Sequence, residues 1–117
     1  MPISFRETAE FQKDVRRLVK KYKSLAEDLE LFKTIIAKSP FGFGAHFHII
    51  TKKNNVAIIK ARLFCRYLRG KTLRIIYAYS EKRDNIEIIG IFEFIELYFK
   101  GEKENEDSAR IKEYLKK

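Results

Sequence analysis

The sequence predicts one α+β domain in which a short N-terminal strand and a helical hairpin pack on a twisted antiparallel β-sheet, followed by a charged C-terminal helix. Two patterns carry this prediction. Apolar residues recur at spacings of three and four over residues 9–38, and apolar and polar residues alternate with period two in the later strands. With 117 residues, 45% of them hydrophobic, residues 1–117 can form one core but not two ordinary domains.

The first strand and the first helix are adjacent in the sequence. Residues 3–8 (I-S-F-R-E-T) alternate apolar and polar side chains, as a short strand does. Thr8 is placed to cap a helix over residues 9–23, whose apolar side chains form one stripe while the opposite face is basic. That basic face is interpreted as a solvated helix surface in preference to an anion-binding stripe.

The second helix follows through almost no loop. Ser24 and Glu27 have the spacing of a capping box, and apolar residues at helical spacing continue to about residue 38, so the two helices form a hairpin on one side of the sheet. Residues 45–51 then predict a short strand with His46 and His48 on one side. Two histidines at this spacing are metal ligands or acid–base groups in some proteins, but no third His or Cys accompanies them, and an ordinary structural role is favoured.

The stretch from Val56 to Arg66 alternates two chemistries with period two. One face of this strand is apolar and is expected to enter the core; it carries Ala57, Ile59, Ala61, Leu63 and Cys65. The other face carries Lys60, Arg62, Phe64 and Arg66. Three cations around an aromatic ring do not suit a core, but they do suit an RNA backbone.

The remaining strands continue as a meander. Residues 72–79 and 86–99 predict two more strands, and the second is apolar on both faces near its middle, as a central strand is. Gly90 within it marks a bulge or a close approach of backbone. Residues 102–117 are highly charged and predict a terminal helix that packs weakly.

Charge and cysteine content restrict the partners and the compartment. Lys and Arg number 25 against 16 Asp and Glu, giving a formal charge of +9 and a pI near 9.7. A domain this basic usually binds nucleic acid or an acidic protein, although solvated lysines alone would give the same count. The single cysteine, Cys65, excludes an intramolecular disulfide and, without a signal peptide or an apolar run of transmembrane length, indicates a cytoplasmic protein.

Three segments in order resemble the RelE/ParE superfamily of bacterial and archaeal toxins. They read I-I-K-A-R at 58–62, T-L-R-I-I-Y-A-Y at 72–79 and F-I-E-L-Y-F-K-G-E-K-E-N-E-D at 94–107. The resemblance implies a RelE-like fold and a small toxin held inactive by a cognate antitoxin protein. It also implies one of two activities: RelE-like members cut mRNA on the ribosome, and ParE-like members poison DNA gyrase.

The residues themselves favour RNA cleavage. Cutting RNA without a metal needs a base for the 2′-hydroxyl proton, an acid for the leaving oxygen and cations near the phosphorane. The resemblance places basic residues at Lys60, Arg62 and Arg74, and the strand end supplies a candidate base, Glu96 (or Glu93). The expected catalytic residues are Lys60, Arg62, Arg74, Glu96, Tyr98 and Lys100, and the expected RNA-binding residues are Arg66, Lys71 and Lys103.

Structural roles for some of these residues remain open alternatives. Tyr98 is also a candidate core residue, and Glu96 could pair with Arg74 across strands. The function expected is that of a toxin that cleaves translated mRNA, with a gyrase inhibitor or a catalytically inactive nucleic-acid-binding protein as alternatives. The antitoxin, mRNA and the ribosome are the expected partners, and no metal, cofactor, small-molecule ligand or membrane is expected.

Overall fold

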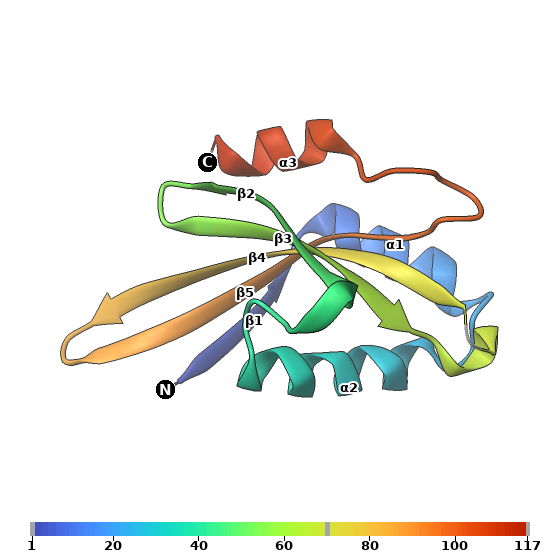
Figure 1. Ribbon diagram of the computed structural model, residues 1–117, viewed down its shortest axis with the longest axis horizontal. Helices are drawn as coiled ribbons and strands as arrows, with labels where there is room; N and C mark the ends of the chain where they lie inside the picture. The colour runs from blue at the N-terminus through green and yellow to red at the C-terminus, as the bar shows by residue number, and fades with distance from the viewer. Residues whose placement is uncertain (1, 70, 117) are drawn as a thin grey trace.

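A computed structural model of the chain describes residues 2–69 and 71–116, so the predicted end of the last helix at residue 117 lies outside the described residues. The elements are β1 (Ile3–Glu7), α1 (Ala9–Val19), α2 (Leu25–Lys38), η1 (Gly44–His46), β2 (Phe47–Lys53), β3 (Val56–Phe64), η2 (Arg66–Leu68), β4 (Thr72–Asp84), β5 (Glu87–Phe99) and α3 (Ser108–Leu115). They form the predicted α+β architecture (Figure 1).

The five strands form one sheet in the order β1-β5-β4-β3-β2. The strands from β2 to β5 form the predicted antiparallel meander, but β1 pairs with β5 in parallel, so the sheet is mixed and not antiparallel throughout. A parallel pair needs a long connection between its strands, and the whole chain between β1 and β5 supplies it. The first strand thus becomes an edge strand beside the last.

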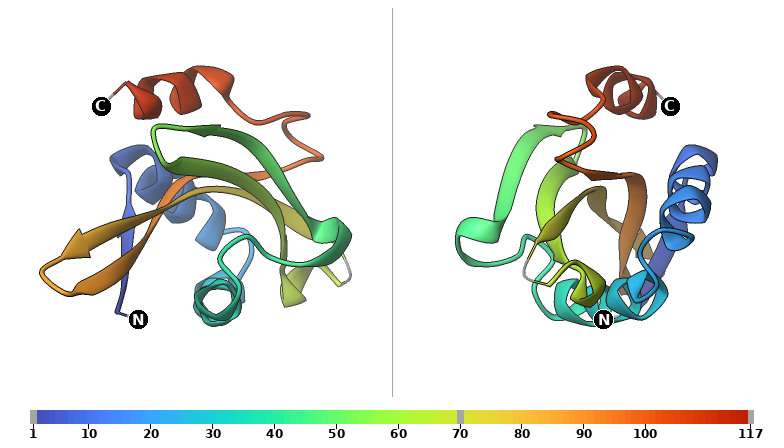
Figure 2. Two further views of the ribbon diagram at one scale, coloured as in Figure 1. Left: turned by 60° about the vertical axis from the view of Figure 1, so that its left-hand side comes forward. Right: turned by 90° about the vertical axis from the view of Figure 1, so that its right-hand side faces the viewer.

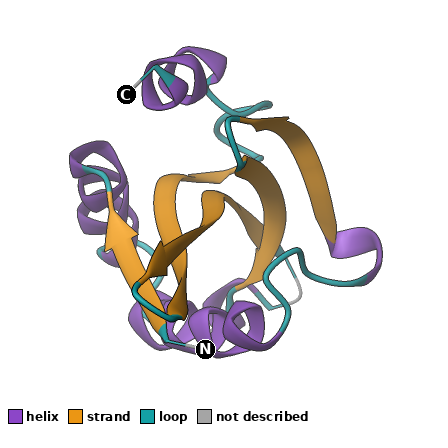
Figure 3. Cartoon of the chain, turned by 90° about the vertical axis from the view of Figure 1, so that its left-hand side faces the viewer, coloured by secondary structure: helices purple, strands orange, loops and turns teal. Residues whose placement is uncertain are grey.

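Helices α1 and α2 cover one face of this sheet, and α3 lies on the other face (Figures 2 and 3). The Thr8 hydroxyl accepts a hydrogen bond from the Phe11 amide (3.1 Å) and caps α1 as predicted. Phe11, Leu18 and Leu25 are fully buried against the strands. The apolar face of β3 lies in the same cluster, which confirms the two-faced character of that strand.

The start of α2 differs from the prediction. Ser24 makes no capping bond within the helix; its hydroxyl donates to Asp28 (2.7 Å) and accepts from the Tyr67 amide (2.9 Å), while Glu27 pairs with Arg66. The predicted capping box is therefore wrong, because η2 lies against this end of α2 and takes up both side chains. The sequence pattern did not indicate that residues 66–68 contact the start of α2.

The C-terminal helix packs more firmly than the sequence indicates. It begins at Ser108, where the Asp107 carboxylate accepts hydrogen bonds from the Ala109 and Arg110 amides, and not at residue 102. Ile111 is 6% exposed and joins a second apolar cluster on the sheet with Ile58, Ile76, Ala78, Ile95 and Tyr98. Weak packing of α3 was thus a wrong prediction.

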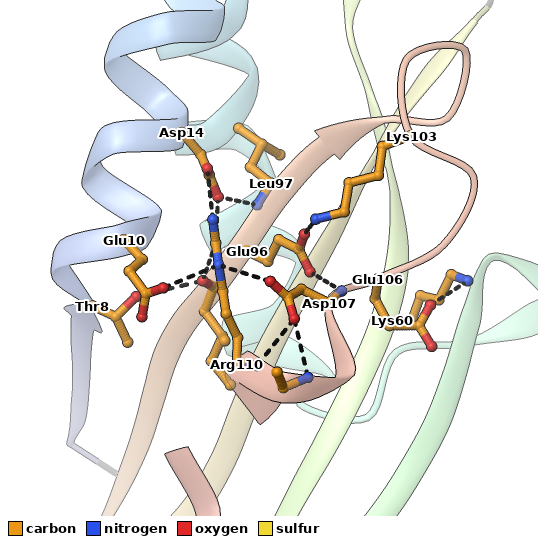
Figure 4. Close-up of polar contacts among 12 residues, drawn as sticks. Thr8, Glu10, Asp14, Lys60, Glu96, Leu97, Lys103, Glu106, Asp107 and Arg110 are labelled. Atoms are coloured by element: carbon orange, nitrogen blue, oxygen red, sulfur yellow. Dashed lines mark hydrogen bonds and ion pairs between the residues drawn. The ribbon is translucent and has the colours of Figure 1, made fainter. Parts of the chain in front are cut away.

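An ion pair between α1 and α3 closes the edge of β5. Strand β1 ends at Glu7, so beyond Phe94 the edge of β5 that faces away from β4 has no strand beside it. The Leu97 amide donates to Asp14 (3.1 Å), and the Ile95 carbonyl accepts from Arg110 (3.1 Å). Asp14 and Arg110 bind each other through two bonds of 2.7 and 3.1 Å (Figure 4). Buried backbone groups require such partners, so this pair both completes the sheet and fixes α3 over it.

Replacing Asp14 by Ala should destabilise the protein strongly. The change leaves a largely buried guanidinium and the Leu97 amide without their acceptor, which costs about 3 kcal/mol in the free energy of unfolding. Urea unfolding at neutral pH measures it. Glu10→Gln is the matched control on the same helix: Glu10 also pairs with Arg110 but is largely exposed, so its loss should cost less than about 0.5 kcal/mol. Equal losses for the two variants would contradict this role of Asp14.

Candidate nucleic-acid interface

A β-bulge in β5 places the candidate residues on the face that carries α3. Across the β4–β5 pair, Ile76 opposes Glu96 but Tyr77 opposes Phe94, so Ile95 is an extra residue in β5. A bulge of this kind redirects the side chains that follow it. As a result Ile95, Glu96 and Tyr98 all reach the α3 side, whereas the sequence indicated a bulge, if any, at Gly90.

The register aligns the candidates in two adjacent rows across the sheet. One row holds His48, Lys60, Ile76 and Glu96. The next holds Arg62, Arg74 and Tyr98. Successive rows on one face lie two residues apart along each strand, about 6.6 Å. The structure therefore brings five of the six predicted catalytic residues together on one surface.

Arg62 and Arg74 stand directly opposite each other on β3 and β4. Arg62 is exposed and Arg74 is partly buried, with one guanidinium nitrogen donating to the Thr72 hydroxyl (2.6 Å). Neither has a carboxylate partner in the part of the chain that the structure describes, and Glu96 does not pair with Arg74. Like charges directly opposite each other destabilise a sheet, and a bound anion would relieve the repulsion between these two guanidinium groups.

The segment from Lys100 to Asp107, here called the tail segment, lies over the first row. Lys103 forms an ion pair with Glu96 and stands 5.6 Å from the centre of the Tyr98 ring, while the Asp107 amide donates to Glu96 (2.7 Å). Glu106 accepts a hydrogen bond from Lys60 at 2.8 Å (Figure 4). The predicted catalytic residue Lys60 and the predicted RNA-binding residue Lys103 are thus engaged with carboxylates of the chain itself.

These contacts set the protonation states around Lys60. The hydrogen bond from Lys60 holds the pKa of Glu106 below its ordinary range, and the same bond raises the pKa of Lys60. Burial raises the pKa of the Tyr98 phenol. Its oxygen is buried and has no hydrogen-bond partner among residues 2–69 and 71–116. At neutral pH Lys60 is therefore an ammonium group, Glu106 a carboxylate and Tyr98 a protonated phenol.

The other predicted cations divide into two groups. Lys71 and Lys100 are exposed where β4 begins and β5 ends, next to the Arg62–Arg74 row. Arg66, by contrast, does not share the exposed face of β3: the strand ends at Phe64, and Arg66 pairs with Glu27 and Asp28 of α2. Its expected place beside Lys60 and Arg62 was wrong, because η2 turns its side chain toward the helices.

The sequence analysis missed Glu106, Asp107 and His48 as members of the site. For Glu106 and Asp107 the signal was the cluster of acids in the E-K-E-N-E-D segment, which was interpreted as part of a helix. His48 lies opposite Lys60 on β2, whereas the His46 ring packs against Phe64 (5.1 Å between centroids). No cluster of three His, Cys, Asp or Glu side chains suited to a metal is present within the described ranges, and no helix there is long and apolar enough to cross a membrane.

Comparison with known structures supports the fold. The YoeB/ParE toxin from Agrobacterium tumefaciens superposes with a TM-score of 0.53 at 12% sequence identity, covering 85% of this chain and 98% of that one. No protein-family model matches the sequence, and neither does any curated protein. At this identity the likeness concerns the fold, and the RelE-like α+β fold expected from the resemblance is confirmed.

The different surroundings of Arg66 and Arg62 lead to a stability test. Arg66→Met should lower the urea concentration at the midpoint of unfolding, because buried Asp28 loses its guanidinium partner. Arg62→Met removes an exposed cation that opposes another, so its midpoint should stay unchanged or rise slightly. A lower midpoint for Arg62→Met than for Arg66→Met would contradict these assignments.

Proposed function

We propose that this protein is the toxin of a toxin–antitoxin pair and that it cleaves RNA by attack of the 2′-hydroxyl group on the neighbouring phosphate. The observation that carries the proposal is the Arg62–Arg74 pair, two cations opposed across a sheet without a carboxylate between them. Two guanidinium groups can hold the oxygens of one phosphate in a planar, bidentate manner and stabilise the charge that develops there.

Each neighbouring side chain has a proposed part in the reaction. Glu96 is the proposed base, once Lys103 leaves it. Tyr98 is the proposed acid, because its phenol is protonated at neutral pH and lies in the same row as Arg62 and Arg74. Lys60 supplies a further positive charge, and Lys71 and Lys100 follow the RNA backbone beyond the strand ends.

The partners follow from the same surface. A cognate antitoxin would neutralise Arg62 and Arg74 with carboxylates, and the excess of nine positive charges favours both such an acidic partner and RNA. The expected substrate is translated mRNA in the cytoplasm, with the ribosome presenting it. Both the substrate and the location are part of the proposal.

One observation favours the alternative of a gyrase inhibitor. Glu96 is only 1% exposed and both of its oxygens are bonded to the tail segment, so the acid–base groups are covered in the protein alone. An inhibitor that only binds gyrase would need no such groups. Cleavage assays with RNA and supercoiling assays with gyrase distinguish the two functions directly.

The test of the nuclease proposal is the variant Arg74→Lys, which keeps the charge but loses the planar fork. It should slow cleavage of ribosome-bound mRNA on the order of a hundredfold, the usual cost of one transition-state donor, while RNA binding changes little. Cleaved fragments should carry a 2′,3′-cyclic phosphate or a 3′-phosphate, and a substrate with 2′-deoxyribose at the cut site should resist.

The matched control is Lys20→Ala, which removes an exposed cation at the end of α1, a helix on the face of the sheet opposite the two rows. Its cleavage rate should equal that of the unmodified protein. Full activity of Arg74→Lys at equal expression, or normal cutting of the deoxy substrate, would refute the proposed chemistry. Gyrase inhibition without any RNA cleavage would establish the alternative.

A further inference from the structure

The carboxylate of Glu106 occupies a position with the features of an anion site. It accepts a hydrogen bond from Lys60 at 2.8 Å, and both side chains are about three-quarters buried, at 27% and 24% exposure. His48 lies opposite Lys60 on the neighbouring strand and acts electrostatically on Glu106. The Lys60 ammonium thus lies in a partly enclosed site that the Glu106 carboxylate occupies.

A buried phenol beside this position has no partner. The Tyr98 oxygen is buried, in a residue that is 2% exposed, and it makes no hydrogen bond to the described residues, although the Lys60 ammonium is near enough to offset part of the rise in its pKa. A buried hydroxyl without a hydrogen bond costs free energy, and such a group in a native protein calls for an explanation such as a catalytic role, a water or a bound ion. Tyr98 is influenced electrostatically by both Lys60 and Glu106, so it lies beside the same anion position.

The spacing to the arginine pair matches a nucleic-acid chain. Lys60 and Arg62 are two residues apart on β3 and face the same side of the sheet. Their separation along the strand is about 6.6 Å, close to that of consecutive phosphates in an extended single strand. A phosphate held by Arg62 and Arg74 would therefore place its neighbour near Lys60.

We propose that Lys60 and Tyr98 form a second phosphate subsite, adjacent to the Arg62–Arg74 pair, and that Glu106 fills this subsite when no nucleic acid is bound. Its ligand is a phosphodiester of a single-stranded nucleic acid. The assignment deepens the proposed function, since it rests on the same strand face binding RNA. Glu106 then competes with the ligand. The apparent affinity is therefore the intrinsic affinity multiplied by the fraction of molecules whose subsite is vacant.

Opening the subsite requires little of the fold to move. The backbone of the tail segment is held on either side of Glu106: the Lys103 amide bonds to the Phe99 carbonyl, and the Asp107 amide bonds to Glu96. The Glu106 side chain can leave Lys60 while these bonds and the packing of Ile111 remain. The covering carboxylate therefore acts as a local competitor and needs no unfolding of α3.

The experiment measures binding of a fluorescent single-stranded oligodeoxyribonucleotide, which cannot be cleaved by 2′-hydroxyl attack, at constant salt. Glu106→Gln and Glu106→Ala should each bind about tenfold more tightly, as expected if Glu106 fills the subsite in about nine molecules of ten. Glu104→Gln changes the net charge equally, from an exposed residue of the same segment, and should change affinity less than twofold. The gain should disappear in Lys60→Met combined with Glu106→Gln.

The outcomes separate this inference from the nuclease proposal. Equal affinities of the Glu106 and Glu104 variants, with unchanged unfolding midpoints, would overturn the subsite. A gain that persists without Lys60 would overturn it as well. If the Glu106 variants bind more tightly but the unmodified protein cuts no RNA, the subsite stands and the nuclease proposal fails. If the protein cuts RNA but the Glu106 variants bind no more tightly, the nuclease proposal stands and the subsite fails.

Discussion

On the edge of β5 that faces away from β4, the hydrogen-bonding groups beyond Phe94 have no strand beside them, because β1 is short and ends at Glu7. The Asp14–Arg110 ion pair satisfies those groups from side chains of α1 and α3, and it thereby ties together the two layers that cover the sheet. Without this pair, α3 would rest on a small apolar cluster and the tail segment would lose its fixed end at Asp107. The position of Glu106 over Lys60 depends on that end, so the candidate site depends on the pair as well.

The site combines two physical features that oppose each other. The bulge at Ile95 turns Glu96 and Tyr98 to the face of the sheet that carries Lys60, Arg62 and Arg74. The acidic tail segment neutralises Lys60 on that face. The Arg62–Arg74 pair is left without a carboxylate within the described residues, at an electrostatic cost to the sheet. Under the proposed subsite, an anionic ligand would relieve that cost and would compete with the tail segment at the neighbouring row. An extended polyanion, which can reach both rows, would then suit this surface better than a small molecule.

Periodicity explains which parts of this arrangement were predictable. The faces of β3, the Thr8 cap and the meander follow from local patterns, and the resemblance pointed to Lys60, Arg62 and Arg74 in advance. The bulge, the parallel pairing of β1 and the turn that carries Arg66 to Asp28 depend on contacts between distant segments, which no local pattern encodes. The role of Glu106 was missed for the same reason, since a charged run resembles a solvated helix until its partner is known.

The most direct test of this account is a crystal structure with a short RNA that carries 2′-deoxyribose at the cut position. The account predicts one phosphate between Arg62 and Arg74, the next within hydrogen-bonding distance of Lys60 and Tyr98, and the Glu106 carboxylate withdrawn from Lys60. A nucleic acid bound elsewhere on the protein, with the Lys60–Glu106 contact intact, would contradict it.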